Sequence, residues 1–451
     1  MKINISLSEP TNSYEFAGII LNCDCPNVQS VALNIEYRNL YEFTKLKSGI
    51  AFDLFFISCI VYGTDILIPR KIYGNDGWTR ELELLLPVGC PNIFHNCKAE
   101  LEYTLNFLTG DNWHISFEER TLKNMFKTGK RQKVYKDTLR AKHKVVNLFS
   151  GGMDSLIGAI DQLELSEASL CLVSHTDSMF KGAKKDQKDI LELLRKRYKH
   201  FFHIPTRVDM SKHDLNGNSY DKETTLRSRS FLFLSMAVLV AEAIDKTMPV
   251  NIPENGTISL NYPLTPSRRS SCSTRTTHPH FISSFQSVLR KLELEHQVVN
   301  KYQLYTKGEM VYNCENQELL LKTYPLSCSC GKRGTRKDIR DNGTVSHCGV
   351  CMPCIYRRAA LNKIKVHEIV GTDIFNSIKR PITDIPDMPA LICYLRRALN
   401  LRDIELGLLD NGPLPLDQLN NYAQVVMRTR NELKEWIKEN SNPEIQKLFG
   451  L

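Results

Sequence analysis

Apolar and polar residues alternate in two patterns between residues 145 and 325. Short apolar runs predict strands at 145–149, 170–174, 201–204, 250–252 and 302–305. Apolar residues spaced three and four apart predict helices at 156–163, 184–199, 230–244, 281–294 and 307–321. We expect the last helix to begin with a capping box formed by Thr306 and Glu309. Strands that alternate with helices indicate an α/β fold, a parallel sheet with helices on both faces.

The chain on either side of this region has other patterns. Before it, apolar stretches predict strands at 18–23, 31–37 and 82–89 and a buried helix at 50–65, which indicates an N-terminal α+β domain. After it, amphipathic segments predict a helical C-terminal extension. The expected division is 1–120 for the N-terminal domain, 121–144 for a linker, 145–325 for the α/β domain, 326–365 for a cysteine-rich segment and 366–451 for the extension.

The composition of the chain is typical of a soluble globular protein. The chain has 451 residues, 42% hydrophobic and 24% charged, as in soluble globular proteins of two or three domains. No run of 18 apolar residues and no signal-peptide pattern at the N-terminus are seen, so we expect a cytoplasmic protein without a membrane span. In the cytoplasm most of the fourteen cysteines should be reduced, and a cysteine cluster then indicates a metal site.

The net charge of +9 is concentrated in the linker, where residues 121–144 carry nine Lys or Arg residues and the single acid Asp137. Such a segment is either a solvated basic linker or a surface that binds nucleic acid or an acidic partner. Charge alone leaves both interpretations open.

A glycine-rich turn follows the first predicted strand of the α/β domain. Its residues are Ser150, Gly151, Gly152, Met153, Asp154 and Ser155. Two glycines allow the backbone to approach a phosphate, and the following helix offers free N–H groups to an anion. Asp154 would be repelled by phosphates unless it holds Mg²⁺ or its waters. The turn therefore predicts a nucleotide phosphate site, with a ligand-free helix cap as the alternative.

Three cysteines with regular spacing, Cys348, Cys351 and Cys354, suit a tetrahedral four-cysteine zinc site with Cys328 or Cys330 as fourth ligand. An iron–sulfur cluster is the alternative, and the glycine in the Cys-Gly-Val-Cys turn favours zinc. His347 lies next to the cluster in the sequence. With four protein ligands the zinc would be structural.

The Ser-Gly-Gly-Met-Asp-Ser turn resembles the PP-loop of the N-type ATP pyrophosphatases, which have the adenine nucleotide alpha hydrolase-like fold. Together with the distal cysteines and Arg-Arg-Ala-Ala-Leu at 357–361, it resembles the QueC family of 7-cyano-7-deazaguanine synthases over about residues 145–365. The resemblance implies ATP binding by residues 150–155, roles in the reaction for Asp154, Arg229 and Lys307, and a zinc ligand role for Cys328 with the three spaced cysteines. Glu254 is matched to a family glutamate. The long N- and C-terminal parts are absent from QueC enzymes, and this layout is similar to the QueC-like proteins of anti-phage systems, the QatC type among them.

The resemblance implies an ATP-dependent carbon–nitrogen ligase. It would adenylate a 7-carboxy-7-deazaguanine-like carboxylate, release pyrophosphate, and join the acyl group to ammonia or to an amine on a partner protein of a defence operon. The alternatives are an ordinary nitrile synthase, a tRNA-modifying PP-loop enzyme, and a non-catalytic scaffold that binds nucleotide and zinc.

Overall fold

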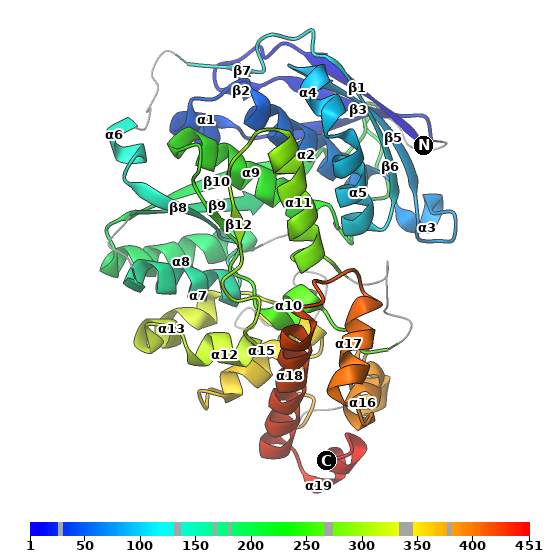
Figure 1. Cartoon of the computed structure of the whole chain (residues 1–451), viewed down its shortest axis with the longest axis vertical. Coiled ribbons are helices and arrows are strands. Elements are labelled where there is room, and N and C mark those ends of the chain that lie inside the picture. Colours follow the sequence, from blue (N-terminus) through cyan, green and yellow to red (C-terminus); the bar gives the residue numbers. More distant parts are fainter. Residues whose placement is uncertain are drawn as a thin grey trace.

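A computed structural model describes residues 1–25, 30–129, 137–165, 169–178, 182–265, 274–332, 346–376 and 381–451. Figure 1 shows an elongated molecule with the N-terminal elements at one end and the C-terminal helices at the other. Its strands are β1 (Lys2–Ser8), β2 (Glu15–Phe16), β3 (Gly18–Cys23), β4 (Val31–Ile35), β5 (Glu81–Val88), β6 (Asn112–Glu119), β7 (Phe126–Lys127), β8 (His143–Leu148), β9 (Ser169–Thr176), β10 (Phe201–Met210), β11 (Val250–Asn251) and β12 (Val298–Val299).

The helices up to the cysteine-rich segment are α1 (Arg38–Thr44), α2 (Ile50–Leu67), α3 (Arg70–Tyr73), α4 (Pro91–Asn96), α5 (Lys98–Thr109), α6 (Asp137–Arg140), α7 (Met153–Leu165), α8 (Ala183–Arg197), α9 (Arg229–Ile244), α10 (Gly256–Leu260), α11 (Pro279–Lys291), α12 (Lys307–Tyr312), α13 (Gln317–Thr323) and η3 (Tyr324–Leu326). Those that follow are α15 (Met352–Asn362), η4 (Ile382–Asp384), α16 (Met388–Arg396), α17 (Leu401–Leu409), α18 (Leu419–Asn440) and α19 (Pro443–Leu448).

Ten strands form one mostly parallel mixed sheet in the order β12-β11-β8-β9-β10-β4-β3-β1-β5-β6. The five strands from β12 to β10 are parallel, as predicted for the α/β region. β4 then pairs antiparallel with β10, for example Val208 with Ile35, and joins the N-terminal strands to the same sheet. The sheet therefore crosses the expected boundary near residue 120, and one apolar core extends from Ile3 to Leu294.

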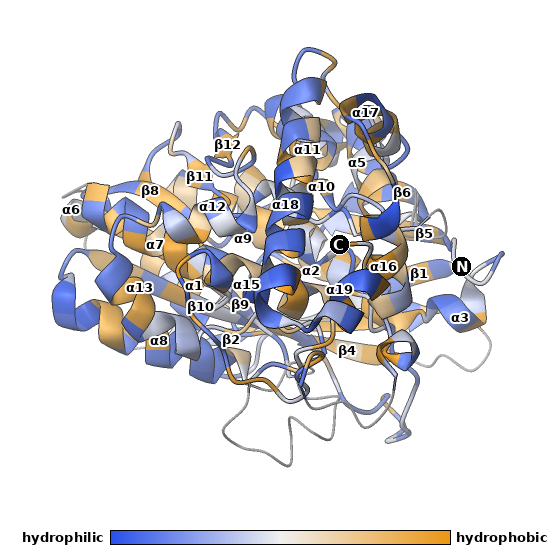
Figure 2. Ribbon diagram, turned by 90° about the horizontal axis from the view of Figure 1, so that it is seen from below, coloured by the Kyte–Doolittle hydropathy of each residue, from blue (hydrophilic) through white to orange (hydrophobic). Residues whose placement is uncertain are grey.

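Helices cover both faces of the parallel strands. α9 and α2 pack on one face within the core shared with the N-terminal strands, while α7 and α8 form a separate core with Leu170 and Leu172 of β9. In Figure 2, α8 carries both hydrophilic and hydrophobic residues, which fits its buried side chains Ile190, Leu191 and Leu194. These packing contacts confirm an α/β protein with helices on both sides of the sheet.

Among the described residues one helix, α2, is long and apolar enough to cross a membrane by length and composition. However, 94% of it is buried inside the protein, where it packs on α9 and the sheet. Burial of this kind is typical of a core helix, as the sequence pattern at 50–65 predicted.

Two predictions near residue 300 were wrong. The last parallel strand is β12, and residues 302–305 form a turn in which the Tyr305 N–H donates to the Tyr302 carbonyl at 2.9 Å. The helix expected at 307–321 is divided into α12 and α13, because the Asn316 side chain caps a new helix by accepting from the Leu319 N–H. The capping box of Thr306 and Glu309 is confirmed.

The C-terminal helices form a third core together with the cysteine-rich segment. Cys348, Cys351 and Cys354 are buried in it beside apolar residues of α16, α17 and α18. In the basic linker, residues 130–136 lie outside the described residues, between β7 and α6.

Candidate functional site

The candidate site lies where the order of the parallel strands reverses. From β8 the chain proceeds to β9 and β10 on one side and later returns to β11 and β12 on the other. Ligands of open α/β sheets bind at the carboxyl ends of strands at such a reversal. Here the loops after β8 and β11 border a cavity of about 520 Å³, within the range of about 300–1,000 Å³ for small-molecule sites.

The turn after β8 is held by its own serines. Gly151 has a φ of +86°, a conformation that favours glycine. Its N–H donates to Ser155 Oγ at 3.2 Å, and the Gly152 N–H donates to Ser150 Oγ at 3.2 Å. Ser155 Oγ in turn donates to the Gly152 carbonyl at 2.9 Å. The turn thus directs backbone N–H groups and hydroxyls towards the start of α7 beside the cavity.

A buried ion pair forms one wall. Lys307 Nζ lies 2.5 Å from Asp154 Oδ1, and the Asn255 amide donates to Asp154 Oδ2 at 2.6 Å. Burial acts to raise the pKa of Asp154, but the Lys307 charge and hydrogen bonds from Glu254, Lys307 and Asn255 hold that pKa below its usual value. Asp154 is therefore ionised when its neighbours are in place.

Glu254 has the opposite character. Burial and the charge of Asp154 raise its pKa well above the usual value for glutamate, which favours the protonated form, and its side chain is hydrogen-bonded to Asp154. A protonated carboxyl next to an ionised one is the usual result when two acids share a buried site.

Arg229 brings a second cation to the cavity. It is the first residue of α9, its Nε lies 3.4 Å from His175 Nδ1, and its guanidinium lies 5.2 Å from the centre of the Phe233 ring. Burial, assisted by Arg229, lowers the pKa of His175 to about 3, so this histidine is neutral. The ionisable groups that line the cavity are Arg229, Lys307, Asp154 and Glu254. The two cations are the groups that would attract an anionic ligand.

The structure brings together most of the residues that the sequence singled out. Ser150, Gly152, Met153, Asp154, Ser155, Arg229 and Lys307 all line the cavity. Gly151 does not line it and provides the turn instead. Sequence analysis missed Asn255, which holds Asp154 and also caps α10 by accepting from the Ile258 N–H. The Asn-Gly pair before this short helix was the available signal.

A magnesium ion bound directly by Asp154 does not fit this arrangement. Both oxygens of Asp154 already have protein partners, Lys307 and Asn255, and burial and the charge of Asp154 raise the pKa of Glu254, the second carboxyl in the cavity. Hard cations prefer several free oxygen ligands. The sequence predicted that Asp154 holds the metal, but in the structure Asp154 pairs with the ammonium of Lys307.

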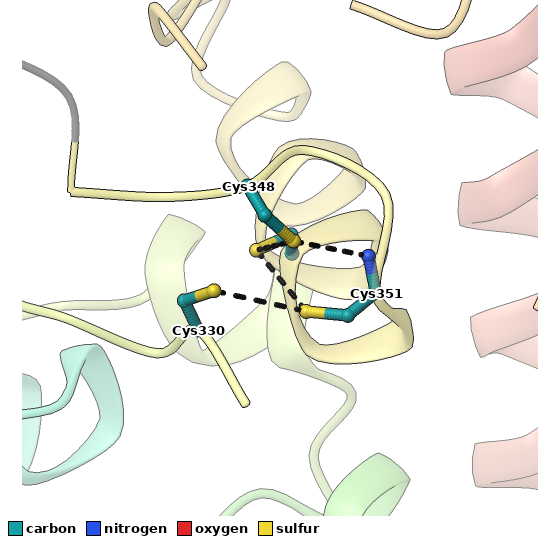
Figure 3. A group of neighbouring side chains, drawn as sticks. Cys330, Cys348 and Cys351 are labelled. Carbon is teal, nitrogen blue, oxygen red and sulfur yellow. Dashed lines mark hydrogen bonds between the residues drawn. The ribbon is translucent and has the colours of Figure 1, made fainter. Parts of the chain in front are cut away.

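Four cysteines form a compact cluster beside this cavity (Figure 3). The Sγ atoms of Cys330 and Cys351 are 4.0 Å apart, those of Cys348 and Cys354 3.8 Å, and those of Cys351 and Cys354 3.3 Å. Tetrahedral zinc with Zn–S bonds of about 2.3 Å requires sulfur atoms about 3.8 Å apart. Four thiolates at these distances fit a structural zinc ion.

The fourth cysteine of the cluster is Cys330, not the expected Cys328. Cys328 lines the cavity, and its backbone N–H donates to the Gly151 carbonyl at 3.0 Å. Burial raises the pKa of its thiol to about 11. His347 is also outside the cluster, since its Nε2 accepts from the Ser329 N–H at 3.1 Å.

The cysteine-rich segment also touches the glycine turn. Cys328 binds Gly151 as described, Ser329 Oγ lies 3.5 Å from the Met153 N–H, and Ser329, Gly331 and Pro353 form part of the cavity wall. A metal held by Cys330 would therefore fix one wall of the cavity. Comparisons of the chain with protein-family models, with curated proteins and with solved structures gave no match.

Proposed function

We propose that this protein is a QueC-like ATP-dependent ligase that adenylates a carboxylate in the cavity between β8 and β11. The observation that carries the proposal is the meeting of the glycine turn, the start of α7, Lys307 and Arg229 around one cavity. Backbone N–H groups at a helix start and paired cations are the features that bind phosphates.

In the proposed reaction an oxygen of the substrate carboxylate attacks the α-phosphorus of ATP. The bond from this phosphorus to the bridging oxygen breaks, and pyrophosphate leaves with that oxygen. An amine nitrogen then attacks the acyl carbon, the bond to AMP breaks, and the nitrogen loses a proton to give an amide.

Each group has a role that follows from its position. The Gly152 N–H and the hydroxyls of Ser150 and Ser155 bond to one another and to the turn in the structure, and they would exchange these bonds for the terminal phosphates, because they lie at the start of α7 beside the cavity. Lys307 and Arg229 would stabilise the negative charge that grows on the leaving pyrophosphate.

The resemblance to QueC favours a 7-carboxy-7-deazaguanine-like acid as the substrate. The nitrogen donor is ammonia or, in an anti-phage role, an amine on a partner protein. An acceptor of protein size would account for the segments before residue 121 and after residue 365, which a small-molecule synthase does not need.

The test is pyrophosphate release with ATP, the deazaguanine acid and ammonium, followed by mass spectrometry of the acid and of added partner proteins. We expect release to depend on the acid and to fall by about 100-fold or more in Arg229→Gln and Lys307→Met. The control Arg207→Gln alters a half-exposed arginine that pairs with Glu36 outside the cavity and should retain activity. Acid-independent release, or full activity in both cavity variants, would refute the proposal.

A further inference from the structure

The C-terminal helix α18 contacts the elements that carry the site. In Figure 1 it runs beside α10, α12 and α15. Glu432 follows Arg428 by four residues and Thr429 by three, and it therefore neighbours both on the surface of the helix. Thr429 Oγ1 lies 2.6 Å from Thr257 Oγ1 of α10, and Arg428 Nε donates to Glu309 of α12 at 2.6 Å. α18 thus contacts two helices, α10 and α12, whose residues Ile258 and Lys307 line the cavity.

Glu432 makes the contact nearest to the site. Its carboxylate accepts a hydrogen bond from the Thr306 hydroxyl and another from the Gly308 N–H at 3.3 Å. These donors flank Lys307, the residue whose ammonium pairs with Asp154. A side chain at Gly308 would clash, because a Cβ there would lie 2.5 Å from Glu432 Oε1.

The burial of Glu432 explains why its carboxyl needs the hydrogen bonds from Thr306 and Gly308. The residue is 6% exposed, and burial raises the pKa of its carboxyl to about 7, against the hydrogen bond from Thr306. The charged groups that face it are Lys363, which acts to lower this pKa, and Glu309, which acts to raise it. A buried carboxyl in place of an apolar side chain costs stability unless its hydrogen bonds are made, so these two donors account for its presence.

We propose that Glu432 is a positioning residue that holds the residues on both sides of Lys307, Thr306 by its hydroxyl and Gly308 by its backbone N–H, and so directs the Lys307 ammonium to Asp154. The inference rests on the proposed function only for the effect on catalysis. The C-terminal extension then contributes to the site, because Glu432 of α18 holds the first turn of α12 in position.

The test compares Glu432→Gln and Glu432→Ala with Glu435→Gln, a matched change on the same helix at an exposed residue that pairs with Lys363. The first readout needs no activity. Acetylation by an N-hydroxysuccinimide ester is measured by mass spectrometry at Lys307, relative to exposed Lys322 in the same chain. Loss of the hydrogen bonds from Thr306 and Gly308 should raise the relative labelling of Lys307 by about tenfold in Glu432→Ala, and by less in Glu432→Gln, whose amide oxygen can still accept one of them. Glu435→Gln should leave it unchanged.

The second readout is the split between kcat and KM for pyrophosphate release. We expect a lower kcat with little change in KM for the acid, because Lys307 acts on the leaving phosphates. Unchanged labelling of Lys307 in both Glu432 variants would overturn the inference, even if their thermal stability fell. Absence of pyrophosphate release in the unaltered protein would refute the proposed function, while the labelling ratio would still decide the role of Glu432.

Discussion

Replacement of Lys307 by Met should destabilise the protein in a way that depends on pH. The change leaves Asp154, which is 8% exposed, without its cation partner. The variant can avoid a buried charge by binding a proton at Asp154, and the cost of that protonation sets an upper limit on the part of the loss that comes from the unpaired carboxylate. From the usual pKa of 3.8, the limit is about 4 kcal/mol at pH 7 and about 1.6 kcal/mol at pH 5.

The sign follows from the two pKa shifts. In the unaltered protein the pKa of Asp154 is lowered, so its contribution to stability is present above pH 3.8 and is lost as the pH falls through the folded-state value. In Lys307→Met the pKa is expected to rise, so stability is lost as the pH increases. The difference in free energy of unfolding between the two proteins should therefore widen from pH 5 to pH 7.

The assay is urea unfolding followed by circular dichroism at both pH values. The control Lys365→Met removes an exposed pair, Lys365 with Glu439 at 2.8 Å, and should cost less than about 1 kcal/mol at either pH. The double variant Lys307→Met with Asp154→Asn should recover much of the loss, because no charge is then left buried. Equal losses at the two pH values, or no recovery in the double variant, would refute the reasoning.

Two further predictions concern the metal and the packing at the site. Purified protein should hold one zinc ion per chain, and metal analysis should find it lost in Cys330→Ser but retained in Cys328→Ser, since only Cys330 belongs to the cluster; the reverse result would make Cys328 the ligand. Gly158→Ala should lower the thermal unfolding temperature, because the new Cβ would lie 2.2 Å from Pro253 Cβ. Overpacking of this kind costs about 1–3 kcal/mol, against a helix gain of about 1 kcal/mol for alanine. A variant that is more stable than the parent would contradict the packing described here.

Hydrophobic patterns predicted most helices and strands of the parallel region, because these elements form from apolar residues that are close together in the sequence. The strand at 145–149 and the buried helix at 50–65 have strong apolar runs, and both are found in the structure. The strand predicted at 302–305 was wrong. Tyr302 counts as apolar in the pattern, but in the structure its hydroxyl donates a hydrogen bond to Asp161. The junction of β4 with β10 has no local signal, because it pairs residues about 170 positions apart.

Sequence motifs predicted some residues of the candidate site but not the contacts between them. The glycine turn and the capping box place Asp154 and Lys307 at two helix starts, but their contact depends on how α7 and α12 pack. The choice between Cys328 and Cys330 depends on which Sγ atom lies close to the other three cysteines, and the spacing of cysteines along the sequence does not determine that distance. Glu432 lies far along the chain in an ordinary amphipathic helix, and nothing in its sequence context marks it.

The antiparallel strand β4 has a consequence for self-association. Without it, the C-terminal end of β10 at residues 208–210 would be an open sheet edge that could pair with another chain. With β4 in place, the sheet ends at β6 and β12 among the described strands. β12 has only two residues, and the exposed positions of β6 include Glu118 and Glu119. Short or charged strands discourage edge-to-edge pairing. The N-terminal strands thus protect the parallel strands from aggregation, and a chain that begins at residue 137 would expose the edge that they cover.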